Sequence, residues 1–301
     1  MAHAVMDSSR TTQIKVFMAR VPGTGSLWYV VGMLNSNPAA DAAPPHLKRT
    51  QSGGLLTLSL NRGESFNPLS SSMIAALENT FDEVLEDPSV RVIVLRGEGR
   101  GFCAGHDVRE LREFGDDAVR HRQLFDSCSR MMVKIAKLPQ PVIARVHGIA
   151  TAAGCQLVSM CDLAVADESA RFGLPGVNIG LFCSTPAVGV ARNIGRKRSM
   201  EMLLTGDTID AATALAWGLI NRVVASEKLD GEVQSFVDRI LARSGAAIAL
   251  GKSTFYSQIE SSLTGAYGVA GAAMTSNSLF DDATEGIDAF LTKRPPHWRN
   301  S

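Results

Sequence analysis

The chain has 301 residues, of which 45% are hydrophobic and 20% charged, and its 30 basic residues balance its 30 acidic ones. This is the composition of a soluble globular protein, and the length allows one or two domains. Nucleic-acid affinity comes largely from Lys and Arg that displace counterions, so the neutral charge and the lack of a basic stripe argue against a nucleic-acid partner.

The first 46 residues differ in character from the rest. Their longest apolar stretch, residues 27–34, is too short to span a bilayer, and the segment 35–46 contains three prolines and several alanines, which is typical of a linker. We expect residues 1–46 to be a disordered extension. Their weak basic bias also resembles a transit peptide. The five cysteines form no Cys-x-x-Cys pair and indicate a reducing compartment. We therefore predict a cytoplasmic protein, with the mitochondrial matrix as the alternative if the extension is a transit peptide.

Strands and helices are predicted to alternate from about residue 47. A helix is expected from Ser70, whose hydroxyl can cap it, until Asp87-Pro88, because apolar residues recur at helical spacing between them. A second helix is expected over 154–160. Strands are predicted over 54–60, 90–95, 141–146 and 162–166. Strands joined by crossover helices predict a largely parallel sheet with helices packed outside it.

The chain beyond Pro186 has mainly helical patterns. The predicted helices cover 186–193, 198–204, 211–217, 229–243, 246–259 and 285–293. The sequence thus predicts an α/β core over residues 47–245 and a helical C-terminal region over 246–301.

The common cofactor and hydrolase motifs are absent. The stretch Gly97 to Gly101 fails the dinucleotide fingerprint, because Phe102 occupies the position of its third glycine. No P-loop, G-x-S-x-G or H-E-x-x-H pattern occurs, and the six histidines lack metal-ligand spacing. We therefore expect neither a metal nor a bound cofactor.

Two turns rich in small residues each lie between a strand and a helix. The first is Phe102-Cys-Ala-Gly-His-Asp107, and the second runs from His147 to Gln156. Small residues let a ligand, or another backbone, approach the main chain closely. Free N–H groups at helix starts can hold an oxyanion, so two adjacent turns could bind one such group. The alternative from the residues alone is tight helix–sheet packing.

Several motifs, in order, resemble the enoyl-CoA hydratase/isomerase (crotonase) superfamily. The similarity runs from about Leu55 to Arg294. It is carried by the segments 67–70, 101–107, 141–144, 148–150, 154–156, 161–162, 171–173, 204–206 and 217–219. Within that superfamily, residues 151–157 and 175–186 look closest to the enoyl-CoA hydratase domain-containing protein 3 branch.

The resemblance implies a crotonase-type spiral of ββα units, a helical C-terminal region that trimerises, and a pocket for an acyl-CoA thioester. The assembly is expected to be a homotrimer or homohexamer, and coenzyme A enters only as part of the substrate. The thioester oxygen is expected to accept from the N–H groups of Ala104 and Ala153. The substrate-binding residues it implies are Phe66, Pro68, Ala104, Gly105, His106, Asp107, Ala153, Gln156, Pro175, Gly176 and Lys293. The adenine is placed near residues 66–68 and 104–107, and Lys293 is expected to reach a phosphate from a neighbouring subunit.

Two departures from the family pattern bear on the chemistry. Hydratases of this superfamily use two glutamates, and this chain has Gln156 and Gly176 in their places. An amide cannot accept and return a proton at neutral pH, and glycine has no side chain. Losing two such groups would cost a factor of about 10⁴ or more in rate. The resemblance thus implies a retained oxyanion hole without the usual proton-transfer groups.

Other residues could replace them. His106 adjoins the first turn and titrates near neutrality, so it is a candidate base, although it could equally point to solvent. Cys183, Ser184 and Thr185 are candidates for a nucleophile or for packing and capping roles. Asp107 is expected to cap its helix, and Glu110 and Asp162 are expected to be structural.

Three functions stay open at this point. The first is a lyase or isomerase, nominally an enoyl-CoA hydratase of fatty-acid metabolism, in which Gln156 orients water or substrate. The group that moves the proton is then unidentified, with His106 as a candidate. The second is another thioester reaction, such as hydrolysis or decarboxylation, that needs only the oxyanion hole. The third is a catalytically weak protein that binds acyl-CoA or regulates a partner.

Overall fold

The structure is a computed structural model that describes residues 14–20, 27–33 and 45–300, and it divides the chain into two units, residues 1–44 and 45–301. In the first unit, β1 (Ile14–Arg20) pairs antiparallel with β2 (Leu27–Met33). Residues 45 and 46 of the predicted extension belong to the second unit, and its remaining residues lie outside the described part of the chain.

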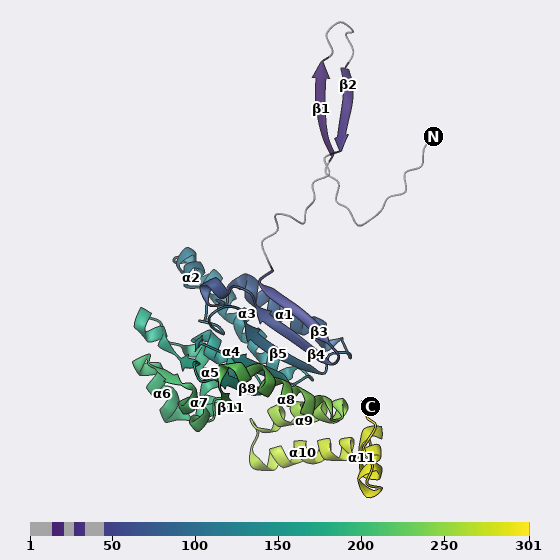
Figure 1. Cartoon of the computed structure of the whole chain (residues 1–301). Coiled ribbons are helices and arrows are strands. Elements are labelled where there is room, and N and C mark those ends of the chain that lie inside the picture. The colour runs from purple at the N-terminus through teal and green to yellow at the C-terminus, as the bar shows by residue number, and fades with distance from the viewer. Residues whose placement is uncertain (1–13, 21–26, 34–44, 301) are drawn as a thin grey trace, which may run out of the picture. The chain divides into compact units, whose positions relative to one another are not determined.

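A six-stranded sheet forms the centre of the second unit (Figure 1). Its strand order is β11-β8-β6-β5-β4-β3, and every neighbouring pair is parallel except β3 with β4. The strands are β3 (Leu47–Ser52), β4 (Leu55–Leu60), β5 (Val92–Gly97), β6 (Val142–Val146), β8 (Leu163–Asp167) and β11 (Arg222–Val224). The α/β class and the largely parallel sheet predicted from the sequence are confirmed. The spiral of repeated units stays a prediction.

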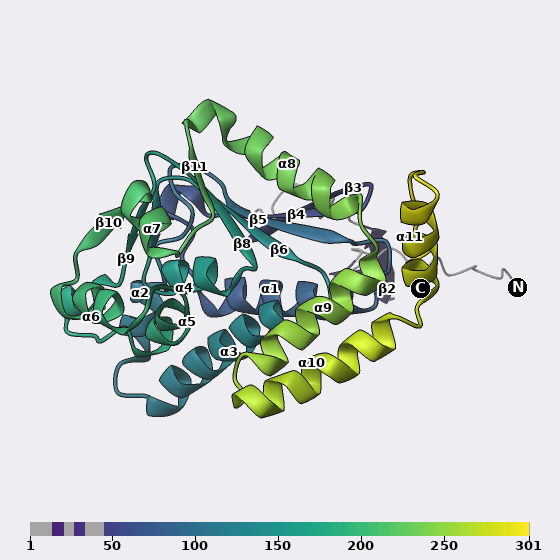
Figure 2. The same ribbon diagram turned by 90° about the horizontal axis from the view of Figure 1, so that it is seen from below.

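Helices cover both faces of this sheet. Figure 2 shows α8 (Leu229–Leu241) on one side of the strands, with α1 (Ser71–Leu85) and α3 (Ala118–Lys137) on the other. Successive side chains of β5 point to opposite faces of the sheet. Val92 and Val94 pack against α8, whereas Ile93 and Leu95 belong to the larger core on the other face. The sheet is therefore buried on both faces.

The remaining elements surround the ends of these strands. A second sheet has the order β10-β9-β7, in which β7 (Ile149–Thr151) is parallel to β9 (Arg171–Gly173) and β10 (Thr208–Asp210) is antiparallel to it. The other helices are α2 (Val108–Phe114), α4 (Ala153–Met160), α5 (Ser184–Ile194), α6 (Arg196–Thr205), α7 (Ala211–Trp217), α9 (Gly245–Gln258), α10 (Leu263–Asn277) and α11 (Asp281–Leu291). Three short 3₁₀ helices are η1 (Gly63–Ser65), η2 (Pro175–Ile179) and η3 (Ser226–Lys228).

Helix caps form as the sequence predicts. The Ser70 hydroxyl accepts from the N–H of Met73 at the start of α1, and Asp107 accepts from the N–H of Arg109 at the start of α2. Along α1, the side chains of Met73, Ile74, Leu77, Phe81 and Val84 are buried. This spacing places one apolar face against the sheet.

A buried ion pair joins α9, the first helix of the C-terminal region, to the core. Lys252 of α9, whose side chain is only 6% exposed, donates to Asp162 at 2.7 Å and to the carbonyl oxygens of Ile135 and Gln140. Tyr256 donates to the other oxygen of Asp162 at 2.9 Å. Asp162 has the structural role that the sequence predicts.

Candidate functional site

The two small-residue turns lie side by side. The N–H groups of Phe102 and Cys103 both donate to the carbonyl oxygen of Ile149, and the N–H of Thr151 donates to that of Cys103, all at 3.0 Å. These bonds connect the end of β5 to β7, so the first turn runs along the start of α4.

Contact between the turns leaves little room for side chains. A Cβ at Gly154 would lie 2.0 Å from the carbonyl oxygen of Cys103, and one at Gly105 would lie 2.8 Å from the Cβ of Ala152. Gly105 also has a φ of +103°, which favours glycine. Tight packing, which was the alternative from the residues alone, is therefore present at this point, and oxyanion binding stays a prediction.

The backbone donors of the first turn differ from the prediction. The N–H of Ala104 donates to the carbonyl oxygen of Phe66 at 2.9 Å, so it cannot serve an oxyanion in this conformation. The sequence could not reveal this, because the acceptor comes from a loop 38 residues earlier. The assignment of Ala104 as an oxyanion donor is wrong for this structure.

The backbone N–H predicted as the donor in the second turn lies at the start of a helix. Ala153 is the first residue of α4, where an N–H has no acceptor within the helix, and the first helical bond is from Gln156 N–H to the carbonyl of Ala152 at 3.1 Å. Ala152 has φ 50° and ψ −120°, a strained conformation for a residue with a side chain. This strain sets the direction in which the chain enters α4.

His106 is largely buried, so the alternative that it points to solvent is wrong. Its Nδ1 lies 3.2 Å from the carbonyl oxygen of Leu69 and donates to it, and its ring meets that of Phe125 edge-on at 5.4 Å. Burial lowers the pKa of the imidazole. Nε2 is enclosed and has no hydrogen-bond partner among the described residues. A neutral, packed imidazole of this kind is poorly placed to shuttle protons to solvent.

The two positions of the missing glutamates are both enclosed. Gln156 is only 4% exposed, and its side-chain oxygen has no partner among the described residues. A Cβ at Gly176 would lie 2.6 Å from the carbonyl oxygen of Leu181 and 2.8 Å from the sulfur of Cys183. The site therefore has no space for a carboxylate at 176 without movement of the backbone.

A cavity of about 530 Å³ opens beside the first turn. Its lining is mainly apolar and, among the described residues, includes no Asp, Glu, Lys or Arg. The lining residues are Ala104, His106, Val108, Leu111, Phe125, Ala152, Pro175, Gly176, Asn178, Ile179, Leu181, Phe182, Cys183, Ser184, Thr185 and Pro186. Four of the eleven residues predicted to bind substrate line this cavity, namely Ala104, His106, Pro175 and Gly176. The other seven do not line it: Phe66, Pro68, Gly105, Asp107, Ala153, Gln156 and Lys293.

No activating partner for the candidate nucleophiles at the start of α5 is found in the described part of the chain. Burial raises the pKa of the Cys183 thiol, and the Ser184 hydroxyl donates to the carbonyl oxygen of Phe182 at 3.4 Å. A reactive thiol needs a lowered pKa. These residues therefore serve as part of the cavity wall.

The residues predicted to meet the adenine and phosphates lie in two places. Phe66 adopts a left-handed conformation next to the first turn, with the Arg100 guanidinium 4.8 Å above its ring. Lys293 follows α11, which lies at the opposite end of this unit from α2 (Figures 1 and 2). Within one chain Lys293 is therefore remote from the first turn, and its contact with a phosphate from a neighbouring subunit stays a prediction.

Comparison with known proteins agrees with these motifs. The family described as "Enoyl-CoA hydratase/isomerase" matches residues 50–301. The chain belongs to this family. It is 43% identical over 263 residues to enoyl-CoA hydratase domain-containing protein 3, mitochondrial, of Xenopus laevis. The aligned region covers 85% of this chain and 89% of that relative.

Solved structures of the family have the same fold. An enoyl-CoA hydratase of Mycobacterium smegmatis is 50% identical, with a TM-score of 0.83 over 85% of this chain and 99% of its own. Human enoyl-CoA hydratase domain-containing protein 3 is 42% identical, with a TM-score of 0.81 over 84% and 100% of the two chains. The resemblance to the domain-containing protein 3 branch is confirmed.

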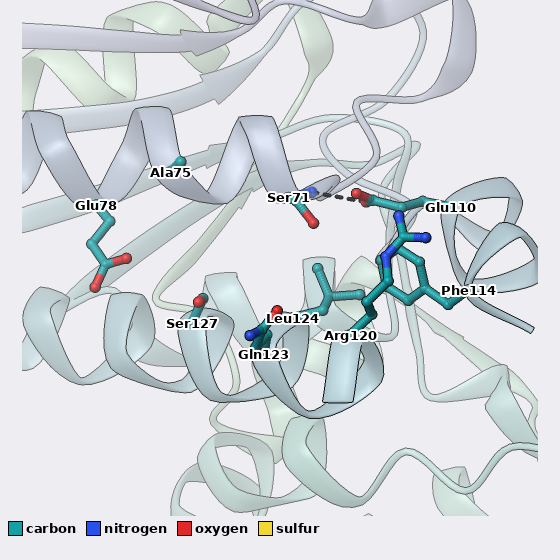
Figure 3. Close-up of a pocket in the computed structure, with 9 residues that line it drawn as sticks. All are labelled: Ser71, Ala75, Glu78, Glu110, Phe114, Arg120, Gln123, Leu124 and Ser127. Carbon is teal, nitrogen blue, oxygen red and sulfur yellow. Dashed lines mark hydrogen bonds between the residues drawn. The ribbon is translucent and has the colours of Figure 1, made fainter. Parts of the chain in front are cut away.

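A second cavity of about 350 Å³ lies between α1, α2 and α3 (Figure 3). There Glu110 accepts from the N–H of Ser71 at 2.8 Å, and the Arg120 guanidinium lies 4.3 Å from the centre of the Phe114 ring. None of the predicted site residues lines it. Glu110 thus holds the start of α1, which is the structural role predicted for it.

The sequence did not identify the side chains that form most of the apolar wall. Val108 and Leu111 come from α2, Phe125 from α3, and Leu181 and Phe182 from the loop before α5. The helical spacing of Leu, Cys and Met over 124–135 was a usable signal for α3, but which face lines a cavity depends on tertiary packing. Among the described residues, no helix is long and apolar enough to cross a membrane, and no cluster of His, Cys, Asp or Glu could hold a metal ion.

Proposed function

We propose that this protein binds acyl-CoA thioesters in the 530 Å³ cavity and polarises the thioester carbonyl, without the proton transfer that hydration requires. The observation that carries this proposal is the composition of the cavity: it adjoins the paired turns, yet none of its described lining residues is a carboxylate. The family membership supports the thioester as ligand.

The carbonyl oxygen is proposed to accept from the N–H groups of His106 and Ala153. In the first turn the N–H of Ala104 is occupied by Phe66, whereas that of His106 has no acceptor in the hydrogen bonds recorded for the described residues. A Cβ at Gly105 would lie 3.3 Å from the backbone nitrogen of Ala153, so the first turn runs close to the second donor. This closeness supports one shared site for the two N–H groups. Each such donor is worth about 3–4 kcal/mol in an enolate-like transition state.

Hydration is disfavoured because no described residue in the cavity replaces the two glutamates. His106 is neutral and its free nitrogen is enclosed, and Gln156 does not line the cavity. A reaction that needs only carbonyl polarisation, such as thioester hydrolysis, is the second candidate, because the two N–H donors are retained.

Calorimetric titration of the full chain with butyryl-CoA and crotonyl-CoA tests this proposal, combined with mass spectrometry of the recovered thioesters. We expect binding with crotonyl-CoA recovered intact. A mass gain of one water on the acyl group would contradict the absence of hydration, and release of free CoA would support the second candidate.

Infrared spectroscopy tests the carbonyl contact without any mutation. A thioester labelled with ¹³C at the carbonyl should show a lower stretching frequency when bound, because two N–H donors polarise the bond. An unchanged frequency in a saturated complex would remove the proposed donors.

Self-association through α9, α10 and α11 is a further part of this proposal. An apolar groove of about 300 Å³ lies between α9 and α10, and large apolar side chains on these helices are exposed, among them Phe255, Tyr267, Met274, Leu279 and Phe290. We propose that they form the subunit contact of a homotrimer.

The compartment is proposed from the relatives. The Xenopus laevis and human proteins carry the word "mitochondrial" in their names. This favours the mitochondrial matrix over the cytoplasm. Fusing residues 1–46 to a fluorescent protein should direct it to mitochondria, and diffuse fluorescence would restore the cytoplasmic alternative.

A further inference from the structure

We infer that the preferred ligand is a long-chain acyl-CoA, with about twelve or more carbons, whose alkyl chain fills the cavity and extends over an apolar rim. This inference rests on the proposed function and specifies its substrate class. The rim is defined here as Val108, Ile179, Leu181 and Phe182.

The volume of the cavity exceeds what a short chain can fill. If each chain carbon takes roughly the space of a water molecule, about 30 Å³, a four-carbon chain fills less than a quarter of the 530 Å³. An underfilled apolar cavity loses contacts on every unfilled side. A chain of twelve to sixteen carbons matches the volume better.

The polar and apolar requirements of such a ligand are met within one cavity. Ala104, His106 and Ala152 of the two turns line the same cavity as Leu111 and Phe125. A thioester carbonyl held at the turns therefore has its alkyl chain directed among apolar side chains. No charged group among the described lining residues has to be desolvated by that chain.

The rim explains how a chain longer than the cavity would be accommodated. All four rim residues line the cavity and are also exposed to solvent, with Ile179 63% and Phe182 48% exposed. They belong to two separate segments, α2 and the stretch from the last residue of η2 to the loop before α5. Apolar side chains gathered at the mouth of an apolar cavity are an extension of its binding surface.

Binding of saturated acyl-CoAs of 4, 8, 12 and 16 carbons to the full chain, each below its micelle concentration, tests the inference. Burial of one methylene tightens binding by about fourfold, so we expect lauroyl-CoA to bind at least 100-fold more tightly than butyryl-CoA. Free CoA serves as the reference for the part of the affinity that the chain does not supply.

Two variants locate the effect. Phe182→Ser and Ile179→Ser should weaken binding of the 12- and 16-carbon thioesters by about 10-fold or more, since they remove rim surface, and should weaken butyryl-CoA binding by a clearly smaller factor. The matched control is Leu85→Ser, because Leu85 is also 48% exposed but lies at the end of α1 and outside the cavity.

The outcomes separate this inference from the proposed function. Equal affinity for all four chain lengths would overturn the inference and leave thioester binding intact, whereas no binding of any acyl-CoA would overturn both. If Phe182→Ser changes the mass of the assembly and not the chain-length dependence, the rim is a subunit contact. If it abolishes sedimentation with phosphatidylcholine vesicles instead, the rim is a lipid-surface contact. Either result would overturn the assignment of the rim to the acyl chain.

Discussion

Gln156 and Gly176 stand where hydratases of the family have glutamates, and the structure predicts that restoring the acids fails. Gln156→Glu would bury a carboxylate with no cationic partner in contact, and Gly176→Glu would bring a Cβ against the Leu181 carbonyl. We expect the double variant to be destabilised by about 3 kcal/mol or more and to show no crotonyl-CoA hydration above the wild type, as measured by urea unfolding and by product mass.

The single variant Gln156→Glu is the control, since it leaves the backbone near Gly176 undisturbed. If the double variant instead hydrates crotonyl-CoA readily while remaining folded, then only the carboxylates are missing and the pocket geometry of a hydratase has survived.

His106 gives the stability a pH dependence whose sign follows from its burial. Burial lowers the pKa of His106 in the folded state below its ordinary value of about 6.5. Between these two values the unfolded chain binds more protons, so the stability contributed by neutral His106 is present above about pH 6.5 and is lost as the pH falls towards the folded-state pKa. We expect the free energy of unfolding to decrease from pH 7.5 to pH 5.

The variant His106→Gln isolates this contribution. Its unfolding free energy, measured by urea denaturation at each pH, should depend on pH less steeply than that of the wild type, by up to one proton. The pKa of His46 is also lowered, by burial and by the Arg62 guanidinium, so part of the slope is expected to remain. Equal slopes in the two proteins would contradict the assignment.

At the scale of elements, local chemistry predicted some helices well and others not at all. Helix α7 occupies the predicted 211–217, because Asp210 caps its start and Gly218 ends it with a φ of +90°. Helix α10 was missed, because its sequence is rich in Gly and Ala, none of its residues is buried, and its apolar residues do not gather on one side of the helix. Strand β3 was missed because only Leu47 of its six residues is buried.

The ion pair between Lys252 of α9 and Asp162 is expected to make a major contribution to stability. Asp162→Asn would leave the buried Lys252 ammonium without its counter-charge, and burial already lowers the pKa of Lys252. Breaking a buried pair from one side costs about 3–5 kcal/mol. We expect a loss of this size in urea unfolding, together with faster amide exchange in α9.

The control for Asp162→Asn is Asp126→Asn, which breaks the exposed ion pair between Arg122 and Asp126. It should change the free energy of unfolding by less than about 0.5 kcal/mol. Combining Asp162→Asn with Lys252→Met should recover part of the loss, because no unpaired charge then stays buried. A loss as small as that of the surface variant would show that α9 does not depend on this pair.

At the scale of the whole molecule, the sequence located the site better than it described it. The glycines Gly105 and Gly154 identified the two turns in the sequence. A side chain is excluded at Gly105 by its positive φ and by close contacts, and at Gly154 by close contacts, so glycine is needed at each position. Which N–H stays free depends on the Phe66 carbonyl, and the cavity wall depends on Phe125 and Phe182 converging from distant segments. Such properties arise only from tertiary packing.

The exposed apolar side chains of the C-terminal helices predict that several copies of the chain assemble. Leu279, which is 81% exposed, and Tyr267 belong to the apolar surface of α10 and the turn that follows it. No residue of the described part of the second unit covers these two side chains. We expect light scattering after size exclusion to give about 96 kDa, three times the 32.1 kDa chain.

Tyr267→Asp with Leu279→Asp should shift the mass to that of the single chain, because buried charges without partners oppose association. Val119→Asp, at an exposed apolar residue of α3, should leave the mass unchanged. A single-chain mass for the wild type would contradict the trimer, and a mass near 193 kDa would indicate that two trimers associate through another surface.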